Sequence, residues 1–115
     1  MKELIEKCIK SAIDYGVVSY EVIVNSRKTN RHYKEKRKYF QELKALPNGI
    51  LGLMNLLNHE HPYVRYTAAI YLLSVDEHMA KNEIEKLKGI SKHLDFSIKY
   101  LLQEWDKGNL REYYK

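Results

Sequence analysis

Apolar residues recur at helical spacing along most of this chain. In the first segment they come in pairs four positions apart, at Leu4, Ile5, Cys8, Ile9, Ala12 and Ile13. This spacing places all six on one stripe of an α-helix, so it predicts an amphipathic helix. We expect the helix to end at Gly16, because glycine readily adopts the left-handed conformation that closes a helix.

A second, longer helix is expected from about Tyr20 to Leu46, a stretch without glycine or proline. Its first turns are rich in β-branched residues and would also suit a strand. We favour a helix because strong helix formers follow and no partner strand is visible. At 100° per residue, one side of this helix carries Val22, Thr29, Tyr33, Phe40 and Leu43. The opposite side carries Arg27, Arg31, Lys34 and Lys38.

Four shorter amphipathic helices are expected after the break at Pro47-Asn48-Gly49. Pro62 suits the first position of one helix, Asp76 is the expected N-cap of the next, and Ser91 or His93 opens the last. Gly89 and Gly108 are expected to end the last two. The four apolar stripes are Ile50, Leu53, Met54 and Leu57; Val64, Ala68, Tyr71, Leu72 and Val75; Ala80, Ile84 and Leu87; and Leu94, Ile98, Leu101, Leu102 and Trp105.

These stripes match each other at a constant offset of thirty positions. The set that begins at Val64 returns at Leu94. In the preceding helices, Ile50, Met54 and Leu57 return as Ala80, Ile84 and Leu87. Residues 50–75 and 80–105 are therefore interpreted as two copies of one helix–turn–helix unit, which bury their stripes by stacking. The alternative is a pair of unrelated amphipathic hairpins in an ordinary bundle, since all amphipathic helices share a period.

The string LLNHEHPYVRYTAAIYLL, residues 56–73, resembles a HEAT repeat. The matching positions are Leu56, Leu57, Pro62, Val64, Arg65, Ala68, Ala69 and Leu72. The second unit departs from the pattern, with Asp95 in place of Arg65 and Ser97-Ile98 in place of the alanine pair. Over nearly the whole chain, the layout resembles a small bacterial family of HEAT-like domains of unknown function, including the closing segment LLQEWDKG.

This resemblance implies a single all-α domain of about six helices, of the α–α superhelix type. Residues 1–46 would form an N-terminal helical pair, 50–75 and 80–105 two repeat units, and 109–115 a tail. Arg65 would contact an acidic residue of the next repeat, and Asp95 is the expected partner. HEAT proteins are mostly binding scaffolds, and some similar small helical-repeat domains resemble antitoxin-type immunity proteins.

Composition fits one domain in a reducing compartment. The 115 residues include five glycines and two prolines, which disfavours a turn-rich β-protein. The single cysteine cannot form an intrachain disulfide, and the N-terminus MKELIEKCIK lacks the apolar core of a signal peptide. No apolar run approaches the roughly 20 residues of a membrane span. We therefore expect a cytoplasmic protein.

The net positive charge is concentrated in residues 27–38, RKTNRHYKEKRK, which hold seven basic residues and one acidic residue. The remaining chain holds 13 basic and 14 acidic residues. Arg27, Arg31, Lys34 and Lys38 would form a column roughly 16 Å long on one helix face, which we call the basic column. Such a column suits a phosphate backbone, an acidic protein or an anionic surface. The alternative is a solvated face that maintains solubility.

Motifs for catalysis are not evident. His59-Glu60-His61 resembles part of a metal site, but it lies in a turn and offers too few ligands, so a polar turn is favoured. Cys8 lies in an apolar stripe and is expected to be a small buried residue. The sequence contains no glycine-rich phosphate loop, nucleophile elbow or helical His-Glu-x-x-His. We therefore expect that the protein is not an enzyme and binds neither a metal ion nor a cofactor.

A macromolecular-binding function is therefore predicted, with another protein as the expected partner. Tyr63 and Tyr66 have no obvious core position, and tyrosine is common at interfaces. An immunity or antitoxin role is one form of this hypothesis. The alternative is nucleic-acid binding through the basic column. A membrane surface is disfavoured because the apolar face opposite the charges is needed for folding, and the oligomeric state stays open.

Overall fold

The computed structural model describes residues 2–19 and 26–110, which form six α-helices and no strand. They are α1 (Lys2–Ser19), α2 (Ser26–Ala45), α3 (Gly49–Leu56), α4 (Pro62–Leu72), α5 (Glu77–Glu85) and α6 (Lys92–Asp106). The prediction of an all-α domain of about six helices is confirmed. The expected first turns of the second helix, residues 20–24, and their alternative as a strand, lie outside the described residues.

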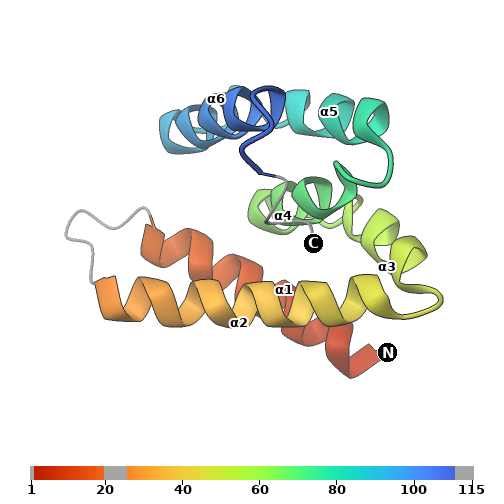
Figure 1. Ribbon diagram of the computed structural model, residues 1–115. Helices are drawn as coiled ribbons and strands as arrows, with labels where there is room; N and C mark the ends of the chain where they lie inside the picture. Colours follow the sequence, from red (N-terminus) through yellow and green to blue (C-terminus); the bar gives the residue numbers. More distant parts are fainter. Residues whose placement is uncertain (1, 20–25, 111–115) are drawn as a thin grey trace.

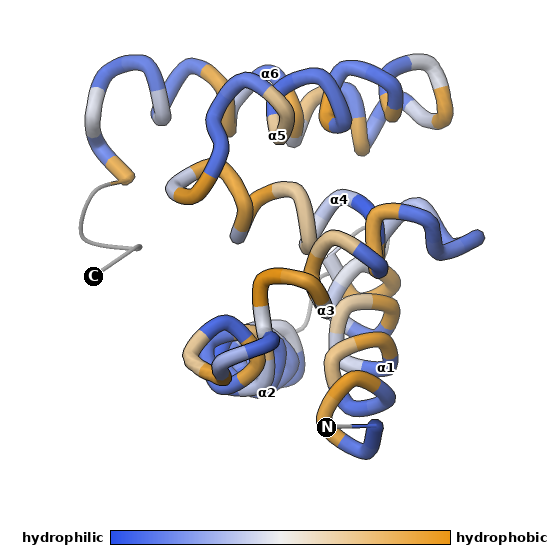
Figure 2. The backbone as a smooth tube through the Cα atoms, turned by 90° about the vertical axis from the view of Figure 1, so that its right-hand side faces the viewer, coloured by the Kyte–Doolittle hydropathy of each residue, from blue (hydrophilic) through white to orange (hydrophobic). Residues whose placement is uncertain are grey.

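The helices lie in layers, with α4 between two helical pairs (Figure 1). The crossed helices α1 and α2 form one outer layer, and α5 and α6 form the other (Figure 1). Short α3 connects α2 to α4 and packs against both. Figure 2, turned by 90°, shows the same order. The Cα radius of gyration is 13.4 Å, close to the roughly 13 Å of a compact 100-residue domain.

Helix α4 forms the centre of the hydrophobic core because it is covered from both layers. Seven of its eleven residues are buried: Val64, Thr67, Ala68, Ala69, Ile70, Tyr71 and Leu72. The small side chains of Ala68 and Ala69 allow neighbouring helices to approach closely. On the α2 side, the Tyr71 ring stacks on Phe40 with a centroid distance of 5.3 Å. The predicted α4 stripe is buried except for Val75, which lies beyond the helix and is exposed.

The predicted end of the first helix at Gly16 is wrong. Helix α1 continues to Ser19, and Gly16 is buried within it. The ring of Tyr63 on α4 lies so close that a Cβ at Gly16 would be 2.3 Å from Tyr63 Cδ2. Gly16 therefore provides space for a neighbouring ring. Gly108, by contrast, follows the C-cap of α6 with a positive φ angle of 79°, as expected of a residue that closes a helix. Gly89 also has a positive φ angle, of 91°, but it does not end its helix as expected, because α5 already ends at Glu85.

The starts of the last three helices follow their local sequence. Pro62 is the first residue of α4, as expected. The side chain of Asp76 accepts a hydrogen bond from the Met79 N–H at 3.2 Å and caps α5. Of the two candidates for the start of α6, Ser91 is the N-cap, because its hydroxyl accepts from the Leu94 N–H at 3.1 Å.

Candidate binding groove

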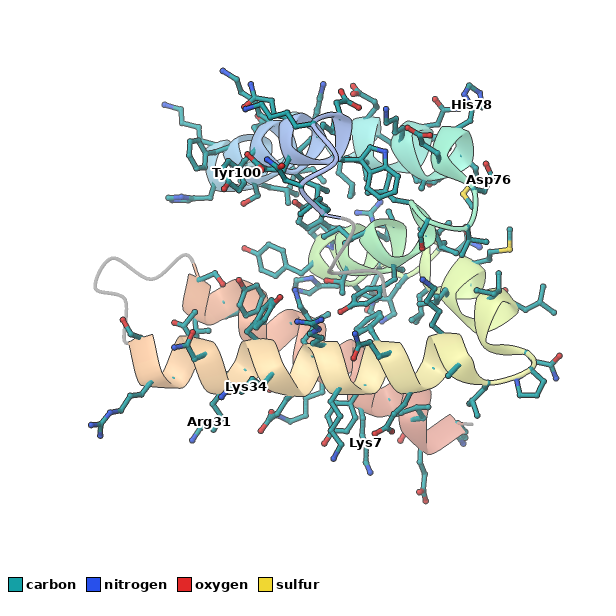
Figure 3. All side chains as sticks on the ribbon, viewed as in Figure 1. Lys7, Arg31, Lys34, Asp76, His78 and Tyr100 are labelled. Carbon is teal, nitrogen blue, oxygen red and sulfur yellow. The ribbon has the colours of Figure 1, made fainter. Side chains whose placement is uncertain are left out.

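A groove of about 350 Å³ opens between α1, α2, α4 and α6. Aromatic side chains from all four helices line it, and we call it the aromatic groove. They are Tyr15, Tyr33, Tyr63, Tyr66, Phe96 and Tyr100. The two from α6, Phe96 and Tyr100, are 73% and 60% exposed, so they lie at its rim. Tyr100 is marked on α6 in Figure 3.

Contacts between helices set the positions of these rings. Gly16 on α1 lets the Tyr63 ring of α4 approach the α1 backbone. The rings of Tyr15 and Tyr33 join α1 to α2, with centroids 5.6 Å apart and planes tilted by 55°. Such tilted pairs are favourable beyond the area they bury. The groove therefore has walls held by packing on three helices and an open rim on α6.

Lys36 is the one buried charged residue among those the structure describes, and it lines the groove. Its side chain comes from α2 and the residue is 5% exposed. The ammonium nitrogen Nζ lies 4.1 Å from the centroid of the Tyr15 ring and 5.4 Å from that of Tyr33. Desolvation by burial lowers the pKa of Lys36 from 10.5 to about 8. The aromatic faces partly compensate the buried charge, as cation–π contacts do.

Lys36 does not stand out in the sequence, because it lies within the basic run of residues 27–38. A signal was present in the spacing. Tyr33, Lys36, Phe40 and Leu43 follow one another at steps of three, four and three residues. This is the spacing of a stripe on one helix face, so Lys36 occupies a core-facing position that an apolar residue would normally hold. Because lysine is usually exposed, the residue type of Lys36 argues against the core-facing position that its spacing indicates.

The basic column faces away from this groove. Arg27, Arg31, Lys34 and Lys38 are all exposed, as predicted. Figure 3 shows Arg31 and Lys34 on the side of α2 that points away from α4. Tyr63 and Tyr66, the other predicted binding residues, are half-buried and line the aromatic groove. The structure thus divides the predicted binding residues between two faces.

The structure does not bring Arg65 and Asp95 together as an ion pair. Asp95 Oδ1 instead accepts a hydrogen bond from the backbone N–H of Gly89 at 2.9 Å, which holds the turn before α6. Arg65 is half-buried, and its Nε atom is buried without a hydrogen-bond partner. The expected contact between the two repeat units is therefore not formed by these side chains.

The His59-Glu60-His61 turn organises the start of α4. His59 Nδ1 accepts from the His61 N–H at 3.0 Å, and His61 Nδ1 accepts from the Tyr63 N–H at 3.2 Å. Burial and the neighbouring His59 lower the pKa of His61. Within residues 2–19 and 26–110, no three His, Cys, Asp or Glu side chains lie close enough together to share a metal ion.

Comparison with known proteins identifies no relative: no family model, curated protein or solved structure matches the chain. In the described part of the chain, no helix is both long and apolar enough to cross a membrane.

Proposed function

We propose that this chain is a non-catalytic binding module that holds a peptide segment of another protein in the aromatic groove. The observation that carries the proposal is a groove of about 350 Å³ with six aromatic residues from four helices along it. Tyrosine and phenylalanine offer large contact areas with few rotatable bonds, so ordering them costs little entropy. The volume lies near the lower end of ligand pockets and suits a few side chains of a partner.

In the same proposal, the hairpins α3–α4 and α5–α6 are two HEAT-like repeat units. Matched burial supports it, because Val64 and Leu94 are both fully buried, as are Ala68 and Ile98. Stacked hairpins of this type present extended binding surfaces. An immunity or antitoxin role, in which the chain binds and blocks a toxin, is one form of such binding.

Selection from a random peptide library displayed on phage tests the groove directly. Peptides that enrich on the wild-type chain should share a motif. We expect the double substitution Phe96→Ser/Tyr100→Ser to weaken their binding at least tenfold, because both side chains lie at the rim. Both residues are largely exposed, so their replacement should leave the fold intact.

Leu51→Ser is the matched control for loss of exposed apolar surface. Leu51 is 62% exposed, lies on α3 and does not line the groove. Its replacement should leave peptide binding unchanged. Failure to enrich any motif, or motifs whose binding survives the Phe96/Tyr100 change, would overturn the proposed function.

Nucleic-acid binding through the basic column is a second candidate. It is favoured by the exposure of all four side chains, which their spacing places on one face of α2. Binding of a fluorescent random DNA duplex, measured across salt concentrations, provides the test. Four phosphate contacts should give a slope of about −3.6 in log K against log salt. Arg31→Glu/Lys34→Glu should reduce that slope by about 2. Absence of binding at low salt would exclude this candidate.

A further inference from the structure

We infer that the aromatic groove recognises a carboxylate: Lys36 pairs with an aspartate or glutamate of the partner peptide, and the surrounding rings hold the apolar residue beside it. This inference rests on the proposed function, because it names the chemistry that the same groove selects. It assigns Lys36 as the specificity-determining residue.

Lys36 carries a buried charge without an acidic partner among the residues that the structure describes. No carboxylate of the described residues lies within the 4 Å of an ion pair, and desolvation alone accounts for the shift in its pKa. Its ammonium group lies over the faces of the Tyr15 and Tyr33 rings. A buried ammonium is normally paired with an anion, because desolvating an unpaired charge is unfavourable. An incoming carboxylate would provide that partner.

Six other ionisable groups among the described residues line the groove. They are the phenols of Tyr15, Tyr33, Tyr63, Tyr66 and Tyr100, and the carboxyl group of Glu104. Phenols are ordinarily uncharged at neutral pH. Glu104 comes from α6, where its Oε2 accepts a hydrogen bond from Asn109 Nδ2 at 2.7 Å. Glu104 is thus engaged by its own helix end, and the groove retains one buried cation.

The number of positive charges in the groove selects the kind of anion that it binds. Lys36 is the only lysine or arginine among the lining residues described. Phosphate groups carry close to two negative charges at neutral pH and are usually met by several donors, often arginine. A carboxylate carries one charge, which a single ammonium balances. The aromatic walls favour an apolar group adjacent to that carboxylate.

Two small probes test this assignment without knowledge of the partner. 3-Phenylpropionate joins a benzene ring to a carboxylate, and 3-phenylpropanamide is its neutral counterpart. Isothermal titration at pH 7 should show the carboxylate binding at least tenfold more tightly than the amide. In Lys36→Met, the two probes should bind equally. Lys34→Met, on the exposed face of the same helix, should keep the full preference.

A pH series on the wild-type chain gives a readout that needs no variant. Lys36 loses its proton as the pH rises through about 8, so the carboxylate should bind about tenfold more weakly at pH 9.5 than at pH 7. Binding of the amide should change much less.

Equal binding of both probes to the wild type, no carboxylate binding, or a preference that survives Lys36→Met would each overturn the inference. Tighter binding of phenyl phosphate than of the carboxylate would reassign the groove to a phosphorylated ligand.

The two proposals can fail separately. Library peptides that depend on Phe96 and Tyr100, yet tolerate replacement of every acidic residue by its amide, would support the proposed function and refute a role for Lys36. A carboxylate preference that depends on Lys36, with no groove-dependent peptide, would retain the anion site and refute the peptide-binding function.

Discussion

Lys36 shows most clearly how one residue can lower stability. Below pH 8 its ammonium is charged in both the folded and the unfolded chain, so folding bears the whole cost of burying it. Between pH 8 and 10.5 the unfolded chain binds more protons, so stability from this group rises with pH. Replacement of a buried charge by an apolar side chain of similar size is often stabilising.

We expect Lys36→Met to raise the free energy of unfolding at pH 7 by about 3 kcal/mol, which corresponds to the lowered pKa. The gain over wild type should disappear above about pH 10.5. Urea denaturation of both proteins from pH 6 to 10.5 measures it, and their difference removes the contributions of groups they share. Lys34→Met should match the wild type, and a gain that does not vary with pH would contradict this account.

Cys8 is expected to be unreactive in the folded chain. Its side chain is fully buried, and desolvation, with a smaller effect of Glu42, raises its pKa to about 12. Because thiolates are the reactive form, labelling by iodoacetamide at pH 8.5 should occur only through unfolding. Mass spectrometry should therefore show rapid labelling in denaturant and very slow labelling without it. Labelling of the folded protein at the rate of a free thiol would show that Cys8 is accessible.

At the scale of elements, the local pattern predicted the helices well because helical spacing is a property of neighbouring residues. Proline and the N-cap side chains likewise act within one turn. The starts of α4, α5 and α6 can therefore be predicted from Pro62, Asp76 and Ser91 in the sequence. The prediction that Gly16 ends a helix is wrong because the role of this glycine depends on the ring of Tyr63, 47 positions further along the chain. The same glycine can end a helix or admit a neighbour, and only the packed structure distinguishes them.

The contact between α1 and α4 can be tested at Gly16. Alanine has a higher helix propensity by about 1 kcal/mol, yet its Cβ would collide with Tyr63. We expect Gly16→Ala to lower stability by about 1–3 kcal/mol, as overpacking does. In Gly16→Ala/Tyr63→Ala the collision is absent, so the two effects should be non-additive in thermal unfolding. A Gly16→Ala chain as stable as wild type would exclude a tight contact.

For the molecule as a whole, the sequence predicted the basic column but not the aromatic groove. The column lies on one helix, so a helical projection of α2 suffices to find it. The groove requires side chains from four helices, and their arrangement depends on how α6 lies relative to α1 and α2. Residue type alone predicts an interface role for Tyr63 and Tyr66. Lys36 cannot be distinguished in the same way, because the basic residues near it in the sequence are mostly exposed.

The separation of the two faces predicts independent binding. Arg31→Glu/Lys34→Glu should reduce DNA binding without changing the affinity for 3-phenylpropionate. Phe96→Ser/Tyr100→Ser should do the reverse, because both residues belong to α6, which lies in the opposite layer from α2 (Figure 1). Anisotropy and titration calorimetry on the same four proteins, with wild type and Leu51→Ser included, would measure this. Loss of both activities in either double variant would show that the faces are coupled.

The central position of α4 also has a consequence for synthesis on the ribosome. A nascent chain that has emerged only as far as residue 56 would contain α1, α2 and α3 but not the helix that covers Phe40. The apolar surface of these early helices would then stay exposed to solvent until α4 has also emerged from the ribosome. A chaperone would engage the growing polypeptide during this interval, and slow translation while α4 is still inside the ribosome would prolong it.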